Sequence, residues 1–425
     1  MLNLKRSSDK KKCSRLKSLF RSIGPGIITG AADDEPSGIM TCLIVGAQTG
    51  LQLIWSALLT IPLMIAVQEM CARIAMATKK GLAGNMKDRF PAWLLYVVIF
   101  LMFFANTFNI AADLAGMTAS LNLLIPLPRS LLALLLSLAI LLSLIFFSYN
   151  RLASLFRWFT LPILAYIASA FFTNLSFKDV ISHTFIPRFD FNKTTITAIV
   201  AMLGTTISPY LFFWQASEEL EEQRSQAAGL KRILVTRKEV KNMRQNVVVG
   251  MVLSNLVMFF VLASAAGTLY QNNITDITNT AQAALALEPL AGPLAALLFT
   301  IGVIGTGILA IPVLAGSAAY AVSEAFNWTE GLDKRFFEAK PFYFTIILSI
   351  FLGLIFSILP FNPITLLYTT AIIYGILAPL LIFLILRLAN TRKIMKDKVN
   401  SPLSNIVNTF TLILMSLAAI SLLFT

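Results

Sequence analysis

The sequence is poor in histidine, in cysteine and in charge. It has one histidine, three cysteines and only 13% charged residues among 425. Cys13, Cys42 and Cys71 have neither the paired spacing of a zinc site nor that of a disulfide framework. No HExxH motif, ATP-binding P-loop or nucleophile–base pair occurs, and one histidine cannot build a catalytic set. We therefore expect neither an enzyme nor a resident cofactor.

Long apolar runs dominate the rest of the chain. Hydrophobic residues make up 57% of the sequence, and the mean hydropathy is +0.77. A run of about twenty apolar residues can cross a bilayer as a helix, and we count eleven such windows. They lie at about 24–46, 51–77, 92–120, 130–149, 158–175, 194–217, 246–268, 292–323, 342–360, 364–388 and 405–424. The predicted fold class is an all-α integral membrane protein with eleven transmembrane helices.

The positive charge is unevenly distributed among the predicted loops. The net charge is +13, yet the loop at 271–288 has no Lys or Arg. The basic loops lie at 79–89, 151–157, 224–244, 334–340 and 387–398. Cytoplasmic loops carry the excess of Lys and Arg, so we expect a multi-pass protein of the inner (plasma) membrane, with a cytoplasmic N-terminus and an external C-terminus. We expect a monomer that contacts the lipid bilayer. We expect no nucleic-acid partner, because membrane orientation already explains the positive charge of the N-terminal segment from Lys5 to Arg21.

The first window contains three consecutive carboxylates, Asp33, Asp34 and Glu35, followed by Pro36. A carboxylate at bilayer depth costs roughly 2.5 to 3.5 kcal/mol, so three together need a cation or water. Pro36 disfavours helix at Glu35, which predicts a helix break at the acids. Broken helices at this depth line cavities, and their freed carbonyls can bind a cation. We expect a cation site here, although a wet outer vestibule is an alternative that stays open.

The sixth window is predicted to break as well. Its hydroxyl residues Thr205 and Ser208 precede Pro209. Five windows separate the two breaks, and an odd number of spans inverts the second group, so we predict two inverted five-helix repeats plus one extra helix. The predicted organisation is a tail at 1–20, a first repeat from 21 to about 177, and a second repeat that starts before 217. The second repeat passes through a cytoplasmic loop at 218–246 and continues over 247–390, and a loop with the eleventh helix follows at 391–425.

Several polar residues inside the windows are predicted to support this site. Asn106 and Asp113 lie seven residues apart and therefore share a helix face, as expected for a polar seam that faces the interior. Gln215, in the second half of the sixth window, is assigned to the same seam. Glu69 is expected to pair with Arg73, four residues on, rather than to act in function.

For two further features we favour a structural interpretation over a functional one. The acidic block Glu218–Glu222 either attracts cations at the inner mouth or forms a solvated helix face, and the second interpretation is favoured. His183 is expected to be a surface residue of an outer loop, not a proton relay.

These motifs resemble those of one known family. Gly24-Pro25-Gly26, Glu35-Pro36-Ser37-Gly38 and Gly46-Ala47-Gln48 are similar to the first span of the Nramp divalent-metal transporters. The broken sixth window and the Gly-rich eighth extend the likeness over residues 20–390, with the Nramp-related magnesium transporters as the most similar branch. The resemblance implies an importer that works by alternating access, with the metal held between the two broken helices. The fold implied is that of the amino-acid/sodium symporters.

The residue pattern departs from the family at the implied metal site. The family's metal ligands fall on Glu35, Gly38, Thr205 (through its carbonyl) and Ser208. Gly38 stands where the family has asparagine, and Ser208 where it has the methionine whose thioether favours Mn²⁺ and Fe²⁺. We expect a roomier, all-oxygen cavity suited to Mg²⁺ with retained waters. The transported ion is therefore expected to be Mg²⁺ or Mn²⁺, with Fe²⁺ less favoured.

The resemblance also bears on coupling. The family's third-helix acids fall on Asn106 and Gly116, which leaves only Asp113, and its ninth-helix arginine pair has no counterpart in 342–359. We therefore expect no strong proton coupling. A proton-coupled Mn²⁺/Fe²⁺ symporter is the first alternative. A sodium-coupled amino-acid carrier of the same fold ranks lower, because three acids would repel the carboxylate of its substrate.

Overall fold

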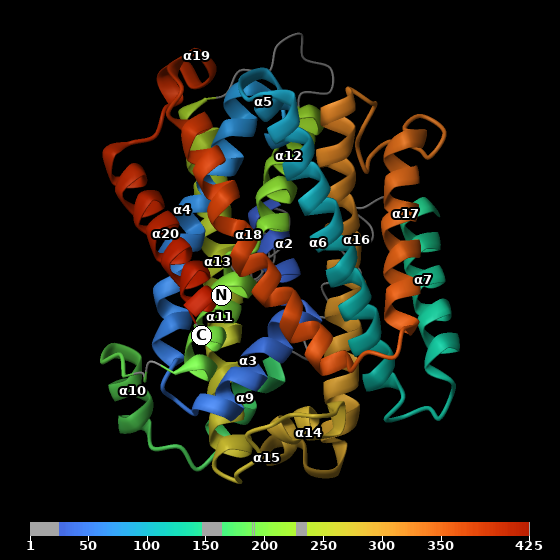
Figure 1. Ribbon diagram of the computed structural model, residues 1–425, viewed down its shortest axis with the longest axis vertical. Helices are drawn as coiled ribbons and strands as arrows, with labels where there is room; N and C mark the ends of the chain where they lie inside the picture. Colours follow the sequence, from blue (N-terminus) through green and yellow to red (C-terminus); the bar gives the residue numbers. More distant parts are fainter. Residues whose placement is uncertain (1–24, 147–163, 189, 191, 227–235, 425) are drawn as a thin grey trace, which may run out of the picture.

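The protein is a bundle of helices (Figure 1). The computed structural model describes residues 25–146, 164–188, 190, 192–226 and 236–424, and these contain no β-strand. The long helices are α4 (Ile54–Thr78), α6 (Ala92–Leu121), α7 (Arg129–Phe146), α13 (Arg237–Ala265), α16 (Ala295–Phe326), α17 (Lys340–Ile358), α18 (Pro363–Ala389) and α20 (Pro402–Ser421). The shorter ones include α5 (Leu82–Arg89), α9 (Leu164–Phe172), α10 (Phe177–Phe185), α14 (Thr280–Ala284), α15 (Glu288–Ala291) and α19 (Arg392–Met395). The predicted basic tail at 1–20 lies outside the described residues, and so do Arg151 and Arg157 of the predicted loop at 151–157.

Nine helical segments within the described residues are long and apolar enough to cross a membrane. They correspond to nine of the eleven predicted windows. The first window is absent from this set because every stretch of Pro25–Thr49 long enough to cross a membrane contains the three acids at 33–35, and the fifth is absent because only α9 of it is described. His183 lies on the surface helix α10, where its ring contacts the carbonyl of Asp179 at 2.8 Å.

Both predicted helix breaks are confirmed. The first window forms α2 (Pro25–Asp33) and α3 (Pro36–Thr49), and the sixth forms α11 (Lys193–Thr206) and α12 (Pro209–Gln226). In each case a proline opens the second piece, as expected because a proline at the first helical turn needs no backbone donor. Figure 1 places α2 and α12 in one half of the bundle and α3 and α11 in the other, so the breaks lie at mid-height.

The first half-helix packs on α13 through its main chain. A Cβ built on Gly30 would lie 2.3 Å from the carbonyl oxygen of Gly250, and one built on Gly26 would lie 2.5 Å from the amide nitrogen of Val247. Gly26 and Gly30 are four residues apart and so lie on one face of α2, the small-xxx-small spacing that lets two helices approach closely in a bilayer. We call this contact the glycine seam.

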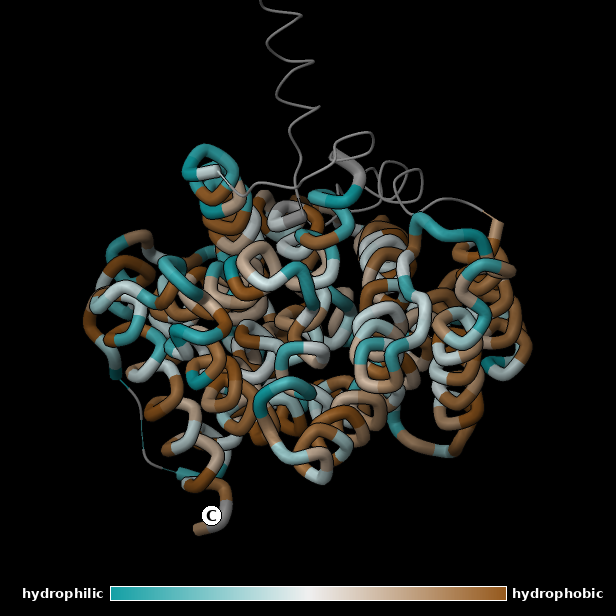
Figure 2. Tube along the Cα trace, turned by 90° about the horizontal axis from the view of Figure 1, so that it is seen from above, coloured by the Kyte–Doolittle hydropathy of each residue, from teal (hydrophilic) through white to brown (hydrophobic). Residues whose placement is uncertain are grey.

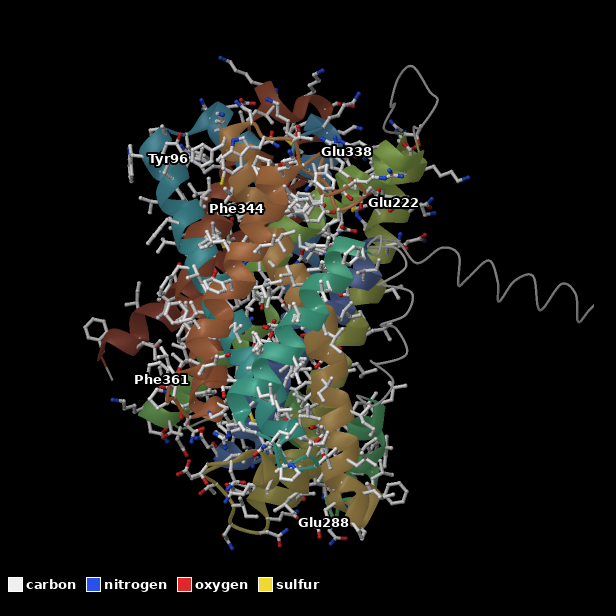
Figure 3. The ribbon with its side chains drawn as sticks, turned by 90° about the vertical axis from the view of Figure 1, so that its right-hand side faces the viewer. Tyr96, Glu222, Glu288, Glu338, Phe344 and Phe361 are labelled. Carbon is white, nitrogen blue, oxygen red and sulfur yellow. The ribbon has the colours of Figure 1, made fainter. Side chains whose placement is uncertain are left out.

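The two ends of the bundle differ in charge. Figure 1 places α5, with Lys87 and Arg89, and α19, with Arg392 and Lys393, at the same end, which we call the basic end. Figure 2 looks onto this end and shows hydrophilic turns facing the viewer, above helices in which hydrophobic residues predominate. In Figure 3, Glu222 and Glu338 lie towards the basic end, and Glu288 lies at the opposite one.

The described parts of the predicted loop at 218–246 are the end of one helix and the start of the next. α12 continues to Gln226 and α13 begins at Arg237, and residues 227–235 between them lie outside the described part of the chain. The solvated helix face favoured for Glu218–Glu222 is wrong for the first two acids, because Glu218 and Glu219 are only 8% and 6% exposed. The sequence shows that this block is charged, but it does not show that other elements of the fold bury it.

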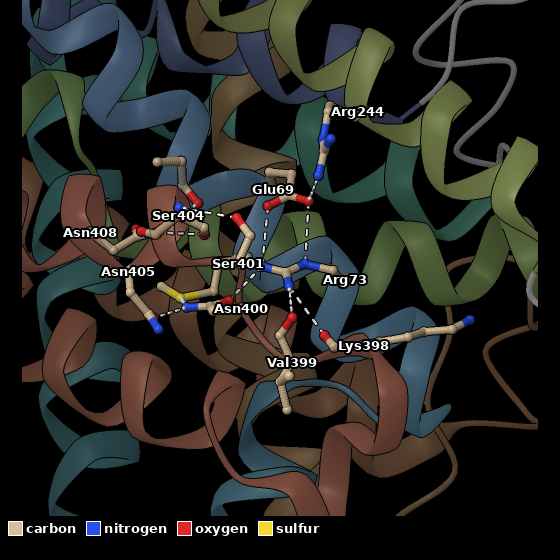
Figure 4. Close-up of polar contacts among 12 residues, drawn as sticks. Glu69, Arg73, Arg244, Lys398, Val399, Asn400, Ser401, Ser404, Asn405 and Asn408 are labelled. Carbon is tan, nitrogen blue, oxygen red and sulfur yellow. Dashed lines mark hydrogen bonds and ion pairs between the residues drawn. The ribbon is translucent and has the colours of Figure 1, made fainter.

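Glu69 pairs with Arg73, as predicted, near the basic end (Figure 4). The Arg73 Nε lies 3.2 Å from the Glu69 carboxylate, and both side chains are buried. Arg244 of α13 reaches the same carboxylate at 3.0 Å, but its side chain is 61% exposed. Arg73 also donates to the carbonyls of Lys398 and Val399 at 3.1 and 3.0 Å. This cluster ties α4 to α13 and to the segment that precedes α20.

Candidate functional site

The site is framed by the carboxyl ends of two half-helices. α2 ends at Asp33 and α11 ends at Thr206, and the two pieces reach the middle of the bundle from opposite halves (Figure 1). The carboxyl end of a helix carries unsatisfied carbonyl groups and a partial negative charge. Two such ends that point into one region favour a cation there.

Side-chain contacts bring the two breaks together. The Tyr210 hydroxyl, next to Pro209, donates to the carbonyl of Ala32 at 3.1 Å. Gly38 faces the other break, because a Cβ built there would lie 3.0 Å from the Thr205 Oγ1 and 3.2 Å from the Asp33 carbonyl oxygen. The acids at 33–35 therefore lie beside the second break rather than in a separate vestibule.

Glu35 points towards α6. Its Oε1 accepts hydrogen bonds from Ser37 at 2.7 Å and from Asn109 at 2.8 Å. Its Oε2 is buried and has no hydrogen-bond partner within the described part of the chain. One oxygen is thus fixed by neutral donors, and the other keeps its lone pairs for an incoming ligand. No cationic side chain pairs with Glu35 among the described residues.

Asp33 and Asp34 turn to a different helix. The Ser254 hydroxyl of α13 lies 2.5 Å from Asp33 Oδ2 and 3.2 Å from Asp34 Oδ1. Asp33 Oδ1 is buried and makes no hydrogen bond to any described residue. The three consecutive acids therefore diverge, two towards α13 and one towards α6, because the backbone leaves α2 after Asp33 and is extended at Glu35 (φ −72°, ψ 165°).

The second break supplies hydroxyl and carbonyl oxygens. Thr205 Oγ1 is buried and lacks a hydrogen-bond partner within the described segments. Ser208 donates to the carbonyls of Gly204 and Thr205 at 3.0 and 2.8 Å, which leaves the lone pairs of its oxygen available. Both residues are buried. These oxygens can contribute to a cation shell, although neither carries a charge.

The predicted polar seam on α6 divides into two parts. Asn106 donates to the Leu314 carbonyl at 3.0 Å and accepts from the Tyr374 hydroxyl at 3.0 Å, so it ties α6 to α16 and α18. Asp113 is buried, and among the described residues no side chain donates a hydrogen bond to its carboxylate, although the backbone amide of Ser37 interacts with it. Asp113 lies one turn beyond Asn109, the donor to Glu35, and its charge interacts with that of Glu35. Asp113 is therefore close enough to act with the site, whereas Asn106 has a structural role.

Gln215 does not join the seam at the break. It lies seven residues beyond Ser208, about 10 Å along the axis of α12. Its side chain is fully buried, and both of its polar atoms are without a partner in the described part of the protein. The structure therefore separates Gln215 from the acids of the first break.

The space beside Gly38 is smaller than the sequence predicts. The terminal methyl of Met258, on α13, lies 3.3 Å from the Cβ position of Gly38. This thioether side chain occupies part of the space that the small residue leaves, so the surroundings are not made of oxygen alone. Within the described residues, no three His, Cys, Asp or Glu side chains are arranged to hold a metal ion. An ion at the breaks would also need carbonyl, hydroxyl or water oxygens.

Sequence reasoning missed four residues at the site. Asn109 could have been found, because it lies between Asn106 and Asp113 in the same window. Ser37 could also have been found, because it follows Glu35 by two residues. Ser254 and Met258 carry no local signal, since only the fold brings α13 to the first break.

Comparison with known proteins gives a consistent result. Residues 26–425 match the family model described as natural resistance-associated macrophage protein-like (Nramp). The chain is 24% identical over 403 residues to a protein named divalent metal cation transporter MntH from Caldanaerobacter subterraneus subsp. tengcongensis, with 92% of this chain and 90% of that one covered. It is 26% identical over 391 residues to one so named from Klebsiella pneumoniae subsp. pneumoniae, with 89% and 88% covered.

Solved structures show the same fold. A manganese transporter from Eremococcus coleocola superposes with a TM-score of 0.74 at 16% identity, covering 96% of this chain and 86% of that one. A Na⁺-coupled sialic acid symporter gives a TM-score of 0.58 at 12% identity, with 94% and 90% covered. At these identities the likeness concerns architecture alone.

Proposed function

The chain belongs to the Nramp family, and from this premise we propose that it imports a divalent cation, Mg²⁺ or Mn²⁺, by alternating access. The observation that carries the proposal is the meeting of two broken helices around buried oxygens without partners, on Glu35, Asp33 and Thr205 among the described residues. Relatives named divalent metal cation transporter agree with it. Membrane transport, rather than catalysis, is the activity of this family.

We assign the cation shell to both breaks. Glu35 supplies the principal charge through its free oxygen, with Asp34, Asp33 and Asp113 as further acids near the ion. Carbonyls at the end of α2, the backbone at Gly38, and the oxygens of Thr205 and Ser208 add neutral ligands. The few charged ligands within direct reach leave room for retained water, as is usual for Mg²⁺.

Ion preference follows from the donor types. The hydroxyl of Ser208 replaces the family's thioether, which lowers the advantage of softer ions such as Mn²⁺ and Fe²⁺. Met258 acts in the opposite direction, because its side chain lies beside Gly38. We propose that both Mg²⁺ and Mn²⁺ are carried and that discrimination between them is modest.

We further propose that uptake is driven by the membrane potential without strong proton coupling. A dication that moves inward across 100 mV gains about 4.6 kcal/mol, which corresponds to roughly a thousandfold accumulation. The proposed arrangement has eleven spans, with the basic end and the N-terminus in the cytoplasm. A proton-coupled Mn²⁺ symporter is the second candidate, favoured by the relatives named MntH.

Proteoliposomes test the proposal. Purified protein is reconstituted, an inside-negative potential is imposed, and Mg²⁺ and Mn²⁺ uptake are followed with ion-sensitive dyes beside a lumenal pH dye. We expect uptake of both ions and at least tenfold slower uptake for Glu35→Gln. The control is Asp397→Asn, which removes an exposed acid at the basic end. Uptake by Glu35→Gln at the wild-type rate would overturn the site, and acidification of the lumen in step with Mn²⁺ uptake would favour the symporter.

A further inference from the structure

A line of polar residues runs along α12 from the second break towards the basic end. At about 100° per residue, Ser208, Gln215, Glu218 and Glu222 fall within an arc of about 80° on one side of this helix. Leu211 also lies on this side and separates Ser208 from Gln215. Glu218 is about 15 Å along the axis from Ser208, and Figure 3 shows Glu222 near the basic end. The line therefore spans the distance from the break to that surface.

Two members of this line are buried and make no hydrogen bond within the described residues. Both polar atoms of Gln215, and the Oε1 of Glu218, have no partner there. Gln215 is 0% exposed and Glu218 is 8% exposed. An unpaired polar atom in such a position costs about 1 to 3 kcal/mol, and more when the group is charged. Packing alone gives no reason for these two side chains to be polar.

Glu221 shows what a structural acid looks like in the same helix. Its carboxylate accepts a hydrogen bond from the Tyr320 hydroxyl and another from the Leu332 amide, the latter at 2.9 Å. Glu221 thereby fixes the loop that follows α16. Glu218 interacts electrostatically with Glu221, yet its Oε1 has no such donor among described residues. The two acids therefore differ in role, although they are three residues apart.

Negative charge around Glu218 is in excess. Its charge interacts with those of Glu219, Glu221, Glu222 and Asp333, all of them acids. The nearby cations act on other acids: Arg224 interacts with Glu221 and Glu330, and Lys334 interacts with Glu330. A buried group with this imbalance is stabilised by a cation.

We propose that Gln215, Glu218 and Glu222 form a second cation station, where a partly hydrated dication pauses between the helix breaks and the basic end. This inference rests on the proposed function and adds the path by which the ion leaves the central site. The ion is held through its water shell, because no three acidic side chains in the described ranges can ligate one ion directly. The amide oxygen of Gln215 is the first polar group on the path beyond Leu211.

Mn²⁺ is the probe for the test. Free and bound Mn²⁺ are counted by electron paramagnetic resonance on the purified full-length protein, with Mg²⁺ as competitor. A variant with Asp33→Asn, Asp34→Asn and Glu35→Gln disables the central site. We expect this variant to keep a weak Mn²⁺ site that Mg²⁺ displaces. Adding Glu218→Gln and Glu222→Gln should weaken that site about tenfold, equal to about 1.4 kcal/mol, whereas adding Asp397→Asn should leave it unchanged.

The outcomes separate the two proposals. Residual Mn²⁺ binding that is the same with the inner substitutions as with Asp397→Asn would overturn the station while leaving the central site intact. Wild-type protein that neither binds nor transports Mg²⁺ or Mn²⁺ would overturn the proposed function itself. If the variants that lack these acids do not elute as folded protein, Gln215→Leu is tested instead, because this substitution changes no charge. That variant should slow uptake at least threefold if the station exists, and an unchanged uptake rate would refute it.

Discussion

Burial rather than distance should decide what each partner of Glu69 contributes to stability. Arg73 and Arg244 approach the same carboxylate at 3.2 and 3.0 Å, so distance alone predicts similar effects. The side chain of Arg73 is 8% exposed, whereas that of Arg244 is 61% exposed. Removing one partner of a buried ion pair costs about 3 to 5 kcal/mol, and an exposed pair contributes about 0 to 1 kcal/mol. Arg73→Gln should therefore destabilise the protein much more than Arg244→Gln.

The magnitude can be converted into a melting temperature. An unfolding entropy of about 2.1 cal/mol/K per residue gives roughly 0.9 kcal/mol/K for this chain length, so each kcal/mol shifts the Tm by about 1 °C. Arg73→Gln should lower the Tm by about 3 to 5 °C and Arg244→Gln by less than about 1 °C. Thermal unfolding of the purified protein in detergent, followed by tryptophan fluorescence, measures both. Equal shifts for the two variants would refute the argument from burial.

Three further predictions follow from the glycine seam, the central site and the loop after α16. Gly30→Ala would place a methyl 2.3 Å from the Gly250 carbonyl oxygen, so we expect little folded protein in membranes by fluorescence-detected size exclusion; Gly84→Ala, whose Cβ would make an ordinary contact at 3.5 Å with the Lys80 side chain, is the comparison for size. Asn109→Ala removes a hydrogen bond to the Glu35 carboxylate, worth about 1.5 to 3 kcal/mol, and should slow Mn²⁺ uptake at least tenfold in a flux assay; an unchanged rate would contradict the role of Asn109 in positioning. Burial, and then a neighbouring acid, raise the pKa of Glu330 from 4.5 to about 8. Folding therefore favours the protonated form, and the Tm in the absence of divalent ions should fall as the pH rises from 5 to 8. Glu330→Gln should flatten this part of the profile, and an equal slope in both proteins would refute it.

The sequence was sufficient to predict the broken helices, because their causes are local. Pro36 and Pro209 act on the residues beside them, and the acids at 33–35 mark the first break without reference to any other element. The pairing of Glu69 with Arg73 was predictable for the same reason, since the two residues are one turn apart. Helical periodicity likewise placed Asn106 and Asp113 on one face of α6.

What the sequence could not predict depends on how helices meet. Ser254 reaches Asp33 only because α13 packs on α2, and Met258 reaches Gly38 for the same reason. The cover over Glu218 comes from elements far along the chain, so a charged stretch was misread as solvated. Asn106 is occupied by Tyr374 and Leu314, which no pattern within α6 reveals.

The glycine seam limits how the bundle can rearrange. Side chains at an ordinary helix interface can change rotamer and let two helices slide by small steps, but Gly26, Gly30 and Gly250 have none. The backbones of α2 and α13 must therefore stay together or separate completely. If α2 moves during the change of access, α13 would therefore move with it as one rigid body. Ser254 on α13 would then stay beside Asp33 and Asp34 during the whole movement.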